Sequence, residues 1–132
     1  SVLIGNDDIM KKAIRIRKIF GGNMRQVGYL AAAGLYALDN HVDRLLDDHK
    51  KAKDIGYSLS KLPYISKVEP VEINIVIFEL NTDVSEKDFV QKLQEHDIHI
   101  ISMGSNKLRI VTHLDYTDDL HEKLLKVLKK LI

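Results

Sequence analysis

Apolar residues recur at helical spacing through the first half of the chain. The spacing predicts a helix over residues 6–20, which the Gly21–Gly22 pair ends because glycine readily adopts the left-handed conformation of a helix cap. A second helix is predicted to begin directly after these glycines. The helical pattern then continues, with a bend near residues 39–40, as a long connecting helix that Pro63 ends and that packs one face against a sheet.

The second half of the chain alternates β-branched runs with amphipathic segments. The run INIVIFEL is the densest and predicts a strand, and Gly104–Lys107 predicts the turn of a hairpin. The predicted order is strand, strand, helix, strand, strand and helix, over about residues 65–68, 73–80, 86–96, 99–103, 108–114 and 117–131. This order predicts an α/β (α+β) fold, with a small, mostly antiparallel sheet and helices packed on it.

Composition places the chain among ordinary globular domains. It has 132 residues, of which 45% are hydrophobic and 30% charged, and this is the length of a single domain. The net charge of +1 argues against a dedicated nucleic-acid surface, because phosphate binding needs a concentrated basic excess. No apolar run reaches the ~20 residues that cross a bilayer, so no membrane partner is expected.

Cysteine is absent from the chain. Neither a disulfide nor a thiolate metal site can form, and a cytoplasmic location is expected. His96 and His99 straddle a predicted helix end with no obvious third ligand, so we expect no metal site. The chain begins without methionine and directly on an apolar run, which is typical of a fragment of a longer protein or of a processed one.

Arg25 lies between the glycine pair and the predicted second helix. Asn23 and Gln26 are spaced as a capping box for this helix. A helix N-terminus presents unpaired amides and a partial positive charge, so an arginine there makes a place to hold an anion. The helix is rich in small residues, which predicts close packing in a core or a subunit interface: Gly28, Ala31, Ala32, Ala33, Gly34 and Ala37.

Lys18 belongs to a basic face of the first predicted helix. The other members of this face are Lys11, Lys12, Arg15 and Arg17. Such a face is usually solvated. The alternative is that one or two of its side chains point at an anionic ligand.

Arg109 lies inside a predicted strand, in the sequence KLRIVTHL. By alternation its side chain shares a face with Val111 and His113, opposite the apolar residues that flank it in the chain. A strand holds such a side chain rigidly, and the planar guanidinium suits a carboxylate or a phosphate. For Arg109 and Arg25 alike, the alternative is an internal salt bridge. His113 lies close to Asp115 in the chain, and a structural role is expected for it.

The run GGNMRQVGYLAAAGLYAL and the later LRIVTHLD carry a resemblance to the low-specificity L-threonine aldolases. These are pyridoxal-phosphate (PLP) enzymes of the aspartate-aminotransferase fold type. The resemblance covers essentially the whole chain and corresponds to the carboxyl-terminal part of the family. It implies that residues 1–40 are a remnant of the large PLP-binding domain, with a strand end, a helix and the start of the small-residue helix. It implies that residues 41–132 are the C-terminal small domain.

The resemblance also implies roles for particular residues. Arg25 would reach the cofactor phosphate of a neighbouring subunit, Lys18 would lie near the site, and Arg109 would bind the α-carboxylate of the substrate. The lysine that forms the Schiff base with the cofactor would lie before Ser1, so no catalytic residue falls in this chain and the isolated fragment is expected to be inactive. The intact enzyme would be a homo-oligomer, dimeric or tetrameric, that uses PLP as an electron sink to cleave threonine or allo-threonine into glycine and acetaldehyde.

Two positions depart from the family's pattern. Asn23 replaces the third glycine of the family's GGG, which narrows the backbone freedom near the phosphate, and Ile73 stands where the family often has threonine. An interpretation from another class also stays open. The chain would then be a free-standing amino-acid-binding regulatory module, with its arginines in a self-contained pocket, or a dimerisation module.

Overall fold

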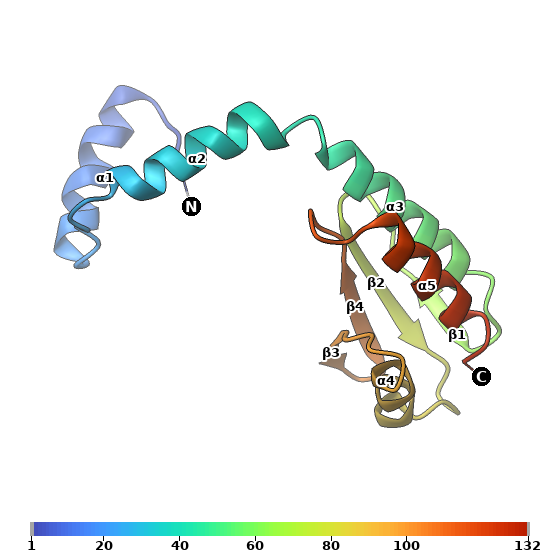
Figure 1. The fold of residues 1–132 in the computed structure, drawn as a ribbon. Coiled ribbons are helices and arrows are strands. Elements are labelled where there is room, and N and C mark those ends of the chain that lie inside the picture. Colours follow the sequence, from blue (N-terminus) through green and yellow to red (C-terminus); the bar gives the residue numbers. More distant parts are fainter. Residues whose placement is uncertain (1, 132) are drawn as a thin grey trace. The chain divides into compact units, whose positions relative to one another are not determined.

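The computed structural model describes residues 2–131 (Figure 1). The chain forms two compact units, Ser1–Asn40 and His41–Ile132. The interpretation of the first unit as part of a larger cofactor-binding domain stays a prediction. Residues 2–6, where the sequence predicts the end of a strand, are irregular. Among the residues described, no helix is long and apolar enough to cross a bilayer.

Helix α1 (Asp7–Ile19) begins and ends as its sequence predicts. The Asn6 side chain accepts a hydrogen bond from the Ile9 amide at 2.9 Å, which caps the N-terminus. At the other end Gly21 takes φ +75°, and the amide of the next residue donates to the Arg17 carbonyl at 2.8 Å. These two features are those of a glycine-terminated helix.

Helix α2 (Gly28–His41) begins later than the sequence predicts. Residues 25–27 form a turn, in which Gln26 has φ +54°. A left-handed residue cannot continue a helix, so the predicted capping box of Asn23 and Gln26 does not form. Arg25 therefore lies in the turn before α2 and not at the predicted helix start.

The long helical pattern is divided in the structure. It breaks at residues 42–44, later in the chain than predicted. The Asn40 side chain donates to the Tyr36 carbonyl at 2.8 Å, so it bonds along α2 and does not end the helix. The second piece, α3 (Leu45–Leu59), ends before Pro63 is reached.

The second unit is built on one antiparallel sheet. Its remaining elements are β1 (Ile65–Val68), β2 (Ile75–Leu80), α4 (Glu86–Gln94), β3 (Ile101–Gly104), β4 (Lys107–Val111) and α5 (Asp118–Leu128). The strand order is β1-β2-β4-β3, and each neighbouring pair is antiparallel. This confirms the predicted α/β class with a small antiparallel sheet.

The predicted hairpin turn of the second unit is also confirmed. Ser105 and Asn106 take φ of 54° and 59°, which is the two-residue turn that matches the twist of a β-hairpin. This turn joins β3 to β4. The Ser85 and Thr117 side chains cap α4 and α5 by accepting hydrogen bonds from backbone amides.

The core of the second unit gathers on one face of the sheet. Alternate residues of β2 and β4, among them Phe78 and Leu108, are fully buried. Helices α3, α4 and α5 all supply side chains to the same cluster, and α3 runs along the sheet (Figure 1). The intervening strand residues, Arg109 included, point to the opposite face and stay partly exposed.

Candidate anion-binding site around Arg109

Arg109 lies at the middle of β4, which is an inner strand of the sheet. It is paired with Ile77 of β2 on one side and with Ile101 of β3 on the other. Directly opposite residues of antiparallel strands project to the same face, so the two isoleucines flank the arginine stem. The burial pattern of β4 matches the predicted alternation, because Leu108 and Ile110 are buried and Arg109 is half-buried.

A cavity of about 320 Å³ lies beside Arg109. This volume is at the lower end of the range for small-molecule sites. The walls come from the chain before β3, from the end of β4 and from α5, and they are Asp97, Ile98, His99, Ile100, Ile101, Arg109, Ile110, Val111, His113, Tyr116, Leu120, Lys123 and Leu124. The cavity is thus mostly apolar, with a few cationic groups among its walls.

The sheet ladder explains why the cavity opens at this place. β3 pairs with β4 from Ile101 to Gly104, whereas residues 98–100 have no strand pairing. The part of β4 beyond Arg109 therefore lacks a paired strand on this side. The opening borders the first turns of α5.

Arg109 has no counter-charge of its own in this cavity. Its Nε atom is buried and has no hydrogen-bond partner, and no carboxylate of residues 2–131 lies within ion-pair distance of its guanidinium. The nearby Lys123 is 3.8 Å from Asp97, so that pair is neutralised. A buried donor without a partner costs about 1–3 kcal/mol, and a ligand carboxylate would remove this cost. The internal salt bridge, which was the alternative for Arg109, does not occur in the described part of the chain.

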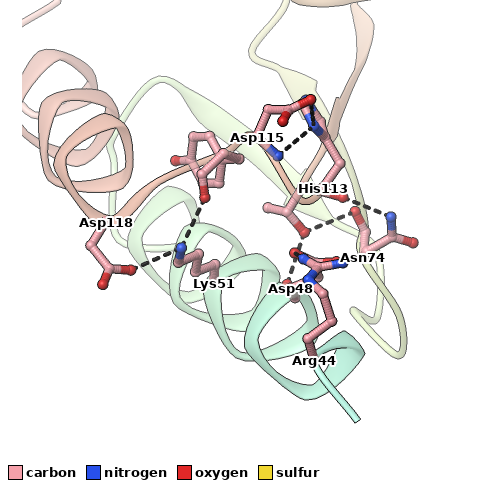
Figure 2. Close-up of polar contacts among 9 residues, drawn as sticks. Arg44, Asp48, Lys51, Asn74, His113, Asp115 and Asp118 are labelled. Atoms are coloured by element: carbon pink, nitrogen blue, oxygen red, sulfur yellow. Dashed lines mark hydrogen bonds and ion pairs between the residues drawn. The ribbon is translucent and has the colours of Figure 1, made fainter. Parts of the chain in front are cut away.

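His113 makes a local contact beside the cavity. Its Nδ1 accepts a hydrogen bond from the Asp115 amide at 3.3 Å and lies 3.9 Å from the Asp115 carboxylate (Figure 2). This contact fits the structural role expected for it.

The segment 112–118, which follows β4 directly, is tied to α3 (Figure 2). The Thr112 hydroxyl donates to the Asp48 carbonyl at 2.8 Å, and Thr112 is fully buried. Lys51 Nζ donates to the Tyr116 carbonyl at 2.8 Å and lies 2.8 Å from the Asp118 carboxylate. We call these contacts of Asp48 and Lys51 with the segment the α3 clamp.

Further hydrogen bonds support the α3 clamp from both sides. Asn74 forms two hydrogen bonds with the backbone of Thr112. The Asn74 side chain donates to the Thr112 carbonyl at 2.8 Å, and the Asn74 carbonyl accepts from the Thr112 amide at 3.0 Å. The buried Asp48 carboxylate is paired with Arg44 at 2.7 Å. Buried charges need such partners, so the first turn of α3 is held in place.

Two groups beside the α3 clamp have shifted pKa values. The hydrogen bond from Lys51 holds the pKa of Asp118 below its ordinary value of 3.8. Burial raises the pKa of the Tyr116 phenol, whose oxygen lies 3.2 Å from His121 Nδ1. Tyr116 therefore stays neutral and serves as a wall of the cavity.

Sequence reasoning did not find Lys51 or Thr112. Lys51 bonds to a carbonyl that lies 65 positions further along the chain, and no local pattern announces such a contact. For Thr112 the sequence does contain one indication. Alternation places it on the same face as Leu108 and Ile110, where a polar side chain needs a buried partner.

Arg25 and Lys18 both belong to the first unit. Arg25 is exposed in the turn before α2, and Lys18 is exposed in the last turn of α1. Neither forms an ion pair with any residue from 2 to 131. A guanidinium and an ammonium that are both exposed and unpaired have the chemistry to hold the phosphate of PLP. Their assignment to the cofactor stays a prediction.

A metal is not implied by the residues described. Within 2–131, no group of three or more His, Cys, Asp or Glu side chains could hold a metal ion. His96 and His99 therefore have no third ligand in this range.

Solved structures with this arrangement define the class of fold. The cystine C–S lyase C-DES, in complex with its product cysteine persulfide, matches 76% of this chain and 28% of its own with a TM-score of 0.60 at 20% identity. A C-DES variant with glycine covalently linked to its PLP cofactor gives the same TM-score. The histidinol-phosphate aminotransferase of Clostridium acetobutylicum matches 62% of this chain and 25% of its own with a TM-score of 0.52 at 23% identity. The chain shares the α/β fold of the matching parts of these lyase and aminotransferase structures.

Sequence comparison then gives the family. The model of the beta-eliminating lyase family matches residues 1–83, and the chain belongs to this family. It is 35% identical over 128 residues to the low-specificity L-threonine aldolase 1 of Arabidopsis thaliana. This alignment covers 94% of this chain and 36% of the relative. It is 62% identical over 52 residues to the low specificity L-threonine aldolase of Escherichia coli K12. That alignment covers 39% of this chain and 16% of the relative. The chain thus spans about a third of the length of the curated relatives it matches.

Proposed function

We propose that this chain is the carboxyl-terminal part of a PLP-dependent L-threonine aldolase. The reaction would cleave the Cα–Cβ bond of threonine or allo-threonine and give glycine and acetaldehyde. The family match and the names of the relatives support this proposal. The observation that carries it is the buried Nε of Arg109, which faces no partner beside a cavity of ligand size.

In this proposal Arg109 binds the α-carboxylate of the amino acid substrate. Its planar fork offers parallel donors to a carboxylate, and the sheet fixes its direction. This contact would orient the substrate and would hold its carboxylate away from water. The flanking Ile77 and Ile101 would limit the movement of the arginine stem.

Arg25 and Lys18 would hold the phosphate group of the cofactor. PLP, when bound, supplies an electron sink for the bond cleavage. We place the intact protein in the cytoplasm as a homo-oligomer in which Arg25 serves the cofactor of a neighbouring subunit. The exposed, unpaired state of both cations supports this role.

A second candidate function is amino-acid binding without catalysis. Every residue that lines the cavity belongs to the second unit, between residues 97 and 124. A regulatory module of this kind would bind a free amino acid through Arg109 and would need no cofactor. A thermal shift with glycine or threonine in the absence of PLP would favour it.

The aldolase proposal can be tested with a chimera. The chain replaces the matching C-terminal third of the Arabidopsis thaliana low-specificity L-threonine aldolase 1, and the purified chimera is assayed with PLP for acetaldehyde released from L-threonine. We expect turnover by the chimera. We expect none by the 132-residue polypeptide alone, because the resemblance assigns the lysine that holds the cofactor to a position before Ser1.

Two results would contradict the proposal. One is a chimera that folds and binds PLP but releases no aldehyde. The other is robust aldehyde release by the 132-residue polypeptide alone.

A further inference from the structure

The α3 clamp holds a part of the chain that forms one wall of the Arg109 cavity. Val111, His113 and Tyr116 line the cavity, and they lie in or beside the segment 112–118. Lys51 is not among the lining residues. Any effect of Lys51 on a bound ligand would therefore pass through the segment that it holds.

Strand alternation transmits the position of Thr112 to the cavity. The Thr112 side chain points to the helix side, where it donates to the Asp48 carbonyl at 2.8 Å. Val111 and His113 flank Thr112 in the chain, so they project to the face that carries Arg109. The depth at which Thr112 sits against α3 thus sets the position of two side chains of the cavity.

Lys51 fixes the other end of the segment. It is mostly buried, with 17% of its side chain exposed, and it bonds to the Tyr116 carbonyl and the Asp118 carboxylate at 2.8 Å each. Its Nζ also lies 5.8 Å from the centre of the Tyr116 ring. A side chain of this kind holds both the backbone and the ring of Tyr116, and the ring is part of the cavity wall.

We propose that Lys51 is a positioning residue of the Arg109 site: it holds the 112–118 segment against α3 and so keeps Tyr116 and His113 where Arg109 can receive a carboxylate. The inference rests on the proposed carboxylate role of Arg109. Lys51 does not touch the ligand. Without Lys51, the Tyr116 carbonyl loses its donor and Asp118 loses its cation, while the bonds of Thr112 remain and keep the fold.

The experiment follows acetate binding to the 132-residue chain by NMR. Acetate is the probe because it is a carboxylate without other recognisable groups. The readout is the Nε–H signal of Arg109, which is assigned by its loss in Arg109→Lys. Ionic strength is held constant with chloride, and every variant is measured well below its unfolding temperature. Under these conditions a change in stability alone does not alter the dissociation constant.

The variants distinguish an effect of positioning on acetate affinity from effects of charge and of stability. Lys51→Met is expected to weaken acetate binding about fivefold, because acetate would then have to order the released segment, at a cost comparable to one hydrogen bond of ordinary strength. Lys51→Arg can donate to the same two oxygens and is expected to restore most of the affinity. Lys53→Met removes a neighbouring exposed charge and is expected to leave the affinity unchanged. Asp118→Asn weakens only the interaction of Lys51 with residue 118, and it provides a milder variant if Lys51→Met does not fold.

The outcomes are distinguishable. Weaker binding by Lys51→Met or Asp118→Asn, with normal binding by Lys53→Met, supports the inference. Unchanged binding by the Lys51 and Asp118 variants overturns the inference and leaves the carboxylate role of Arg109 intact. No response of the wild-type Arg109 signal to acetate contradicts the carboxylate role itself, and the inference falls with it.

Discussion

At the residue scale, Arg109 combines a buried donor with apolar neighbours. Its Nε is buried, and the residues paired with it on both sides are isoleucines, whose side chains cannot accept a hydrogen bond. Two buried polar residues of the same unit, Asp48 and Thr112, do have hydrogen-bonding partners. A buried donor without a partner marks a candidate binding position, because a ligand can supply the missing acceptor.

Tyr64 provides a prediction at this scale. It is almost fully buried, and its hydroxyl donates to the Leu128 carbonyl. Burial raises its pKa from 10.0 to about 12. Between these values an unfolded tyrosine ionises while the folded one stays neutral, so the free energy of unfolding falls as the pH rises through this window.

The measurement compares the wild-type chain with Tyr64→Phe by urea unfolding at neutral and alkaline pH. At neutral pH the wild type is expected to be more stable by about 1 kcal/mol, the usual net worth of a hydrogen bond. This advantage should shrink as the pH rises from about 10 to 12. Tyr29→Phe, which alters an exposed ring, is the control. A constant difference across the window would contradict the assigned burial effect.

At the element scale, α3 joins the sheet and the cavity. One face of this helix packs on the sheet, and its polar residues Asp48 and Lys51 hold the segment after β4. Helix α3 packs closely against the loop between β1 and β2 at Gly56, where an added Cβ would lie 2.7 Å from Val71 Cγ2. No real Cβ contact is this short, so a side chain would push α3 away from the loop between β1 and β2.

Gly56→Ala is therefore expected to destabilise the second unit by about 1–3 kcal/mol, which is the usual cost of overpacking. Gly34→Ala is the matched control, because no heavy atom lies within 4 Å of the position of its added Cβ and alanine favours a helix. Chemical unfolding of both variants measures the difference. Equal stability of the two would show that α3 can shift without loss.

Many elements of this fold follow from local sequence signals. The caps at Asn6, Ser85 and Thr117 and the hairpin turn after β3 are fixed by residues within a few positions of them, so they were predictable. The start of α2 could not be predicted in this way, because Gln26 adopts a left-handed conformation that its residue type does not indicate. The face of Arg109 followed from alternation, whereas the cavity depends on where residues 98–100 leave the sheet.

At the scale of the whole molecule, the candidate binding residues lie in separate units. Arg109 lies in the second unit and has its own cavity, whereas Arg25 and Lys18 lie in the first unit. The relatives are about three times as long as this chain, since it covers 36% of the first of them. In the proposed enzyme, the second unit would bind the substrate, and the first unit would bind the cofactor together with parts outside this chain.

The most direct test of this account is the kinetic effect of Arg109→Lys in the chimera that carries this chain. Lysine keeps the charge but loses the planar fork, so KM for L-threonine should rise about 10- to 100-fold with a smaller change in kcat. Arg15→Lys, on the exposed face of α1, is the control and should leave both constants unchanged. If KM of Arg109→Lys equals that of the unsubstituted chimera, Arg109 does not bind the substrate carboxylate and the central claim is wrong.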